Sequence, residues 1–110
     1  MNTKAVTRRE LSRFRKALDA RQSELARVLR KREGIVIETS PHALDEVQNA
    51  AERELALRDL DRESRLLRSI TGALRRMAEG SYGTCMRCED QISLKRLEAV
   101  PWAGYCIRCQ

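Results

Sequence analysis

The sequence predicts a mainly α-helical protein: a long antiparallel coiled-coil hairpin, followed by a small module built around four cysteines. Three observations indicate this fold class. Apolar residues recur at helical spacing through most of residues 1–79, four cysteines lie close together near the end of the sequence, and aromatic residues make up only 4% of the chain. Because 35% of the residues are charged, little apolar material remains for a large globular core, and elongated helices with a narrow apolar seam are expected.

The first helix is predicted from about residue 8 to residue 32. Its seam repeats at alternating intervals of three and four residues, which is typical of a coiled coil, and one charge interrupts it. The seam positions are Leu11, Phe14, Leu18, Arg21, Leu25 and Val28. Residues 34–39 are rich in β-branched side chains and are expected to form a short connector, so the tip of the hairpin is placed at residues 33–45.

The second helix is predicted from about residue 41 to residue 79. Ser40 can accept a hydrogen bond from an early helical amide, and Pro41 has no amide that would be left unpaired there. The seam positions are Leu60, Glu63, Leu67, Ile70, Leu74 and Met77, with Leu44, Val47, Ala51 and Leu55 extending the spacing toward the start. Two helices joined by so short a connector must run antiparallel, whereas seams that paired between two chains would form a dimeric coiled coil instead.

The four cysteines form two matched pairs, Cys85–Cys88 and Cys106–Cys109, each with two residues between its members. A pair of this spacing on a tight turn directs two thiolates at one metal ion, and residues 89–105 are long enough to bring the second pair to the same ion. With all four coordination positions filled by protein, no position is left for a substrate. The expected cofactor is therefore one structural Zn²⁺, held by residues 80–110, a C4 zinc finger.

Two other roles for these cysteines were weighed. Two disulfides would need an oxidising compartment, but the sequence starts without an apolar signal segment and has no membrane-spanning run, so a cytoplasmic location without membrane association is expected. A redox-active pair needs only one Cys-x-x-Cys motif, whereas two with matched spacing are present.

The charge of the chain indicates an acidic partner or a solvated helix face. The net charge is +6, and residues 1–33 carry eleven basic and four acidic side chains, a net charge of +7 for that segment. The chain has one histidine and no glycine-rich phosphate loop, so no nucleophile or acid–base constellation can be assembled. The protein is not expected to be an enzyme.

Several ordered motifs resemble the DksA/TraR family of zinc-finger transcription factors. The first is Leu57-Arg58-Asp59-Leu60-Asp61-Arg62-Glu63, the second Tyr82-Gly83-Thr84-Cys85-Met86-Arg87-Cys88, and the third Arg96-Leu97-Glu98-Ala99-Val100-Pro101, followed by Cys106-Ile107-Arg108-Cys109. The resemblance covers about two-thirds of the chain. It implies that the protein binds bacterial RNA polymerase, inserts the coiled-coil tip into the secondary channel and modulates the stability of promoter complexes, as members do often together with ppGpp in the stringent response.

The resemblance also implies which residues act. The family's Asp-x-x-Asp-x-Ala tip pattern aligns with His42, Asp45 and Val47, so only the second acid is retained. Arg62 and Leu66 match positions that contact ppGpp or polymerase, but Ser69 stands where a lysine is expected, so polymerase binding is favoured over a ppGpp response.

The alternative function is direct nucleic-acid binding by the zinc finger. Its basic residues are Arg87, Lys95, Arg96 and Arg108. Three acids nearly balance these cations, so direct contact with nucleic acid is not expected to be the main activity.

Overall fold

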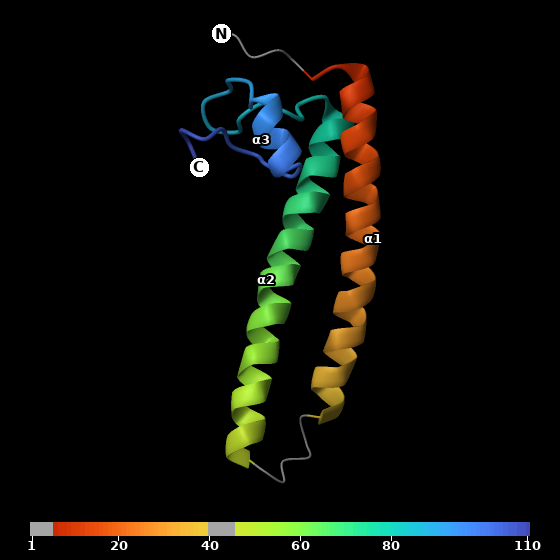
Figure 1. Ribbon diagram of the computed structural model, residues 1–110, viewed down its shortest axis with the longest axis vertical. Coiled ribbons are helices and arrows are strands. Elements are labelled where there is room, and N and C mark those ends of the chain that lie inside the picture. The colour runs from red at the N-terminus through yellow and green to blue at the C-terminus, as the bar shows by residue number, and fades with distance from the viewer. Residues whose placement is uncertain (1–5, 40–45) are drawn as a thin grey trace. The chain divides into compact units, whose positions relative to one another are not determined.

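The computed structural model of the 110-residue chain describes the backbone of residues 6–39 and 46–110, and the side chains of residues 6–32 and 50–110. Three helices follow one another in the order α1 (Arg8–Thr39), α2 (Glu46–Glu79) and α3 (Leu94–Ala99) (Figure 1). Across these ranges, paired extended backbone is limited to one isolated bridge between Thr84 and Gln91. The predicted mainly helical fold class is confirmed, whereas the expected start of the second helix at residue 41 lies outside the described residues.

Helix α1 begins at a capping box and ends later than expected. The Thr7 amide donates to Glu10 Oε1 at 3.0 Å, and the Glu10 amide donates to Thr7 Oγ1 at 3.1 Å, which satisfies two amide groups at the helix start. The helix continues through residues 33–39, where a connector was expected, and reaches Thr39. Gly34 and the β-branched residues after it lower helix propensity by at most about 1 kcal/mol each, whereas no proline occurs before Pro41.

The chain forms two compact units, and each contains parts of α1 and α2. One unit comprises Met1–Gln22 and Arg68–Gln110, and the other comprises Ser23–Leu67. The four-cysteine module thus forms one unit with the adjoining segments of both long helices. The reason is the set of contacts that the module makes with both helices, described below.

In the first unit, α1 and α2 run antiparallel. The ring centroids of Phe14 and Tyr82 lie 6.0 Å apart, and Gln22 Nε2 donates to Thr71 Oγ1 at 3.1 Å. The later residue of α1 thus contacts the earlier residue of the second segment, as expected for antiparallel chains. Phe14 and Leu18 are buried, as are Ile70 and Ala73. The seam position expected at Arg21 is exposed, and its neighbour Gln22 is half-buried instead.

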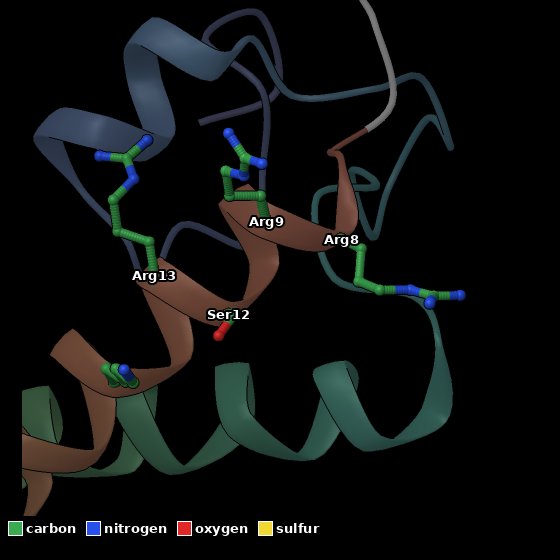
Figure 2. A pocket seen from close by; sticks show the side chains of 5 residues that line it. Arg8, Arg9, Ser12 and Arg13 are labelled. Atoms are coloured by element: carbon green, nitrogen blue, oxygen red, sulfur yellow. The ribbon is translucent and has the colours of Figure 1, made fainter.

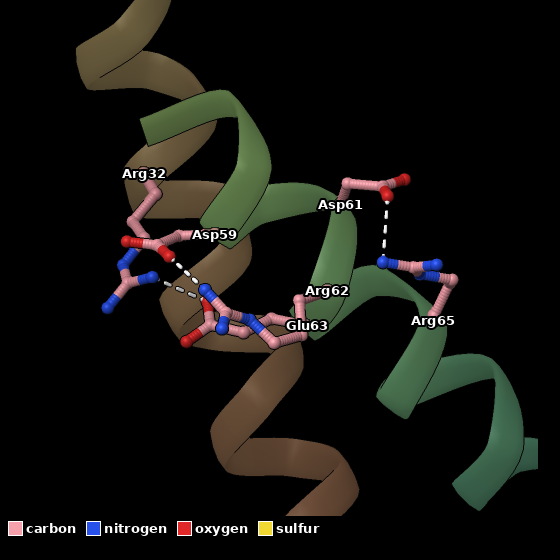
Figure 3. Close-up of polar contacts among 6 residues, drawn as sticks. All are labelled: Arg32, Asp59, Asp61, Arg62, Glu63 and Arg65. Atoms are coloured by element: carbon pink, nitrogen blue, oxygen red, sulfur yellow. Dashed lines mark hydrogen bonds and ion pairs between the residues drawn. The ribbon is translucent and has the colours of Figure 1, made fainter. Parts of the chain in front are cut away.

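In the second unit, Leu25, Leu29 and Leu60 are buried. Leu29 rather than Val28 continues the α1 seam, because a helix of 3.6 residues per turn drifts away from a strict alternation of three and four. Glu63, the charged seam position of α2, accepts a hydrogen bond from Arg32 Nη1 of α1 at 2.6 Å (Figure 3). This half-buried pair compensates a charge within the seam, and removing one partner would leave the other charge uncompensated there.

The structure also corrects the N-terminal extension of the α2 seam. Leu55 is 59% exposed and Ala51 is exposed, so neither belongs to the buried face. Arg53 and Ala56 are half-buried in their place, one helical turn apart and before Leu60. No helix in the part of the chain that the structure describes combines the length and the apolar character of a membrane-spanning segment.

The corrected seam predicts different costs for one substitution at two positions of α2. Leu60→Ala removes a side chain that is 9% exposed and is expected to lower the free energy of unfolding by about 2–4 kcal/mol. Leu55→Ala truncates an exposed side chain and is expected to change it by less than about 0.5 kcal/mol. Urea denaturation followed by circular dichroism measures both. Equal losses for the two variants would contradict the assignment of the buried face.

Candidate metal centre

The four-cysteine module begins where α2 ends in a defined C-terminal cap. Gly80 takes a φ of 85°, a left-handed conformation in which glycine has no Cβ penalty. The Ser81 amide donates to the Arg76 carbonyl at 2.9 Å and the Gly80 amide to the Met77 carbonyl at 3.3 Å. These two bonds form a Schellman motif, which satisfies carbonyls at the helix end and turns the chain into the module.

Backbone hydrogen bonds shape the two Cys-x-x-Cys turns and hold them together. The Cys85 carbonyl accepts from the Glu89 amide at 2.9 Å, and the Cys106 carbonyl accepts from the Cys109 amide at 3.1 Å. The Met86 amide of the first turn donates to the Gly104 carbonyl at 2.8 Å, just before the second turn. Two segments separated by residues 89–105 are therefore adjacent.

The thiol groups have the geometry of a tetrahedral zinc site. The Sγ atoms of Cys85, Cys88, Cys106 and Cys109 all lie within 4.8 Å of one another. The distance between Cys88 Sγ and Cys106 Sγ is 3.7 Å. Four sulfurs at about 2.3 Å from one zinc ion would be about 3.8 Å apart, whereas a disulfide would bring two of them to about 2.05 Å. The spacing fits zinc coordination and excludes a disulfide between Cys88 and Cys106.

Electrostatics lead to the same conclusion. Burial raises the pKa of the Cys85 thiol, but hydrogen bonds from the backbone amides of Cys88, Cys106 and Arg87 outweigh it and lower the pKa to about 6. Burial and hydrogen bonds with the neighbouring cysteines raise the pKa of Cys109 to about 12. Four thiols so close together cannot all ionise without a compensating charge, and a divalent cation supplies that charge.

Helix α3 is an element that the sequence analysis did not predict. Ser93 caps it by accepting a hydrogen bond from the Arg96 amide at 3.2 Å, and Leu97 is fully buried. A serine at the cap and Pro101 just beyond the end are the sequence signals that could have revealed the helix. At six residues, α3 is too short to be stable alone, so the packing of Leu97 is what maintains it.

Two residues that sequence reasoning did not assign to the site connect the module to the helices. Tyr82 is buried, contacts the ring of Phe14 and donates from its hydroxyl to the Pro101 carbonyl at 2.7 Å; burial raises its pKa to about 12. Arg76 Nη2 donates to the carbonyls of Trp102 at 3.3 Å and Ala103 at 3.5 Å. Arg76 could not have been identified from spacing, because its role depends on carbonyls 26 and 27 residues later.

The other predicted site residues fall into two groups. Arg62 and Leu66 lie one turn apart on α2. Arg62 is exposed and pairs with Asp59 (Figure 3). Leu66 is half-buried. His42 and Asp45 of the predicted tip lie outside the described residues, and so does the side chain of Val47.

Two antiparallel helices joined to a closed four-cysteine site define a helical zinc-finger protein, and comparisons identify its family. Residues 80–110 match the model of the prokaryotic dksA/traR C4-type zinc finger. The RNA polymerase-binding transcription factor DksA of Caulobacter vibrioides is 37% identical over 105 residues, 93% of this chain and 74% of that protein. DksA of Escherichia coli K12 is 32% identical over 104 residues, 92% of this chain and 69% of that protein.

A solved structure agrees with the sequence relatives. The structure of transcription factor DksA2 from Pseudomonas aeruginosa matches with a TM-score of 0.82 and 30% identity, covering 94% of this chain and 82% of that one. The chain therefore belongs to the DksA/TraR family, and it contains one structural zinc in a C4-type finger.

Loss of the metal is expected to unfold the module selectively. Cys85→Ser, or removal of zinc with a strong chelator, should unfold residues 82–110 and leave much of the helical signal intact, because the zinc supplies folding energy to a segment with few buried side chains. Nuclear magnetic resonance measures the dispersion of the module's amide signals, and circular dichroism measures helicity. Well-dispersed signals from residues 82–110 in metal-free, reduced protein would contradict a structural role for zinc.

Proposed function

We propose that the chain is a bacterial RNA polymerase-binding transcription regulator that modulates the stability of promoter complexes. The observation that carries this proposal is family membership over nearly the whole length, with relatives in Caulobacter vibrioides and Escherichia coli that are named RNA polymerase-binding transcription factors. In this function the zinc module stabilises the fold and the hairpin acts on the polymerase.

The chemistry of the metal centre supports a binding function rather than catalysis. We propose that Cys85, Cys88, Cys106 and Cys109 are the four zinc ligands, which leaves no coordination position for water or substrate. Catalytic zinc sites keep such a position open, whereas structural sites close it with four protein ligands. The regulator that we propose therefore acts through protein contacts.

Direct nucleic-acid binding by the zinc module has less support. Two of its four basic residues are engaged within the module: Arg96 Nε donates to the Tyr105 carbonyl at 2.9 Å, and Arg108 pairs with Asp90 at 2.7 Å. Among the described residues, the side chains of Arg87 and Lys95 have neither an ion pair nor a hydrogen bond. Two cations give a weak electrostatic contact with a phosphate backbone.

We propose that Asp45 is the residue that acts on the polymerase, with His42 and Val47 completing the tip. The support for this assignment is the alignment of these positions with the family's tip pattern, in which Asp45 retains an acid. His42 stands where the family's pattern has an acid, so the tip lacks one carboxylate, which would weaken electrostatic action there.

We further propose that Arg62 and Leu66 contact polymerase or ppGpp. Their separation of four residues gives a guanidinium and an apolar side chain on one side of a helix, a combination suited to a phosphate and a base. Arg62 would have to exchange Asp59 for the new partner. Ser69 stands where the family has a lysine, so the cation expected at that position is missing. This favours polymerase binding that does not require ppGpp.

Association with polymerase tests the proposed function directly. Core RNA polymerase is expected to co-purify with the tagged protein from its own cells, and the association should survive digestion of DNA because protein contacts maintain it. Loss of the association on digestion, together with DNA affinity that falls steeply with salt, would support the nucleic-acid alternative instead.

Substitution of Asp45 separates binding from action. Asp45→Asn should abolish the effect on promoter-complex lifetime while leaving affinity for polymerase nearly unchanged, and His42→Asp should strengthen regulation because it restores the acid of the family's tip pattern. Asp61→Asn, which changes an exposed acid of α2 paired with Arg65, is the matched control and should behave like the parent. The measurements are promoter-complex decay in vitro and a polymerase titration. Unchanged decay with Asp45→Asn would exclude the tip as the acting element.

A further inference from the structure

The first turns of α1 carry a cluster of basic side chains. Arg8, Arg9, Arg13 and Lys16, together with Ser12, line an open hollow of about 740 Å³ (Figure 2). We refer to these five residues as the α1 basic face. Arg9 and Arg13 extend from neighbouring turns of the helix, and all five side chains are exposed.

Elsewhere on the long helices, five exposed arginines are paired with acids three or four residues away. These pairs are Arg15–Asp19, Arg27–Glu24, Arg58–Glu54, Arg62–Asp59 and Arg65–Asp61. The α1 basic face departs from this pattern, because Glu10 takes part in the capping box with Thr7. Within the described residues, no acidic side chain forms an ion pair with Arg8, Arg9 or Lys16.

Arg13 differs from the other three cations. Its Nη2 atom lies 3.4 Å from Glu98 Oε2 of α3, and its guanidinium carbon lies 4.9 Å from the centroid of the Phe14 ring. The guanidinium of Arg13 therefore already has two partners within the first unit. It also shows that a guanidinium on this face engages a carboxylate presented by another element.

The arrangement is unfavourable for the isolated helix. Arg8 and Arg9 occupy the first turn, where the helix dipole disfavours positive charge, and Arg9 stands four residues before Arg13, where like charges repel. Each effect costs a few tenths of a kcal/mol in the free chain. No acidic side chain of the described residues compensates this cost at Arg8, Arg9 and Lys16, whereas an acidic partner outside the chain would do so.

We propose that the α1 basic face docks on an acidic protein surface of RNA polymerase and steers the association of the two proteins. This inference rests on the proposed function and names a surface that contacts the same partner. Three observations favour carboxylates as the counter-charges. Arg13 already binds one, the face consists of arginine, lysine and serine without aromatic side chains for base stacking, and the helix rises only about 12 Å from Arg8 to Lys16, which suits a few carboxylates.

Steering has a measurable signature. Charges at the edge of an interface act mainly on the association rate, and that rate then falls as salt screens the attraction. The α1 basic face should therefore govern the rate at which the protein binds polymerase, with little effect on the dissociation rate.

The test compares two triple charge reversals on the same helix. Arg8→Glu/Arg9→Glu/Lys16→Glu alters the basic face, and Arg21→Glu/Arg30→Glu/Lys31→Glu makes the same change of net charge at exposed positions without ion pairs in the described structure. Stopped-flow or surface-based kinetics with core RNA polymerase at low and high salt gives both rate constants. Circular dichroism and zinc content verify folding, and Arg8→Ala/Arg9→Ala/Lys16→Ala replaces the first variant if it does not fold.

The expected result is an association rate at low salt about ten-fold lower for the basic-face variant than for the control, with a weaker salt dependence than the parent. Equal slowing by both variants would show a general effect of net charge and overturn the proposal, as would parent-like rates for both. If the parent binds duplex DNA through the same residues, the α1 basic face binds phosphate groups, and the proposal of an acidic protein surface as its partner is wrong. Failure of the parent to bind polymerase would instead refute the proposed function, and this inference with it.

Discussion

Four sulfur atoms must converge on one divalent cation, and the arrangement of the C-terminal third of the chain follows from that requirement. The two cysteine pairs meet because the Met86 amide bonds to the Gly104 carbonyl, so residues 89–105 close into a loop. Thiols this close cannot all be ionised without a metal, as the divergent pKa values of Cys85, about 6, and Cys109, about 12, indicate. Zinc binding and folding of this segment are consequently one process.

The metal centre is also connected to the packing of the long helices. Arg76 of α2 donates to carbonyls of the loop before Cys106, while Tyr82 contacts Phe14 of α1 and bonds to Pro101. The Nε atom of Arg76 is buried without a hydrogen-bond partner, so its guanidinium is held at some cost in desolvation. Through these hydrogen bonds Arg76 connects α2 to the loop before Cys106. The module and the adjoining helix segments accordingly form one compact unit.

Charge serves different purposes along the two helices. Within the second unit, Arg32 and Glu63 form a half-buried pair that compensates a charged position of the seam. Exposed pairs at three- and four-residue spacing contribute little to stability and mainly keep the surface neutral. The basic residues that begin α1 belong to neither group, since Arg8, Arg9 and Lys16 are unpaired in the described structure, and a role in binding accounts for them where a role in folding does not.

The sequence alone determined the helical fold class and the zinc centre, because heptad spacing and two Cys-x-x-Cys pairs are local patterns with direct physical meaning. Local patterns did not determine which seam residues are buried. Arg21 and Leu55 are exposed while Leu29 is buried, because the drift of a 3.6-residue helix against its partner selects the buried face. The continuation of α1 to Thr39, the short helix α3 and the contacts of Arg76 were likewise decided by the fold. Packing overrides weak propensities, and contacts between residues far apart in sequence exist only once the chain has closed around its metal.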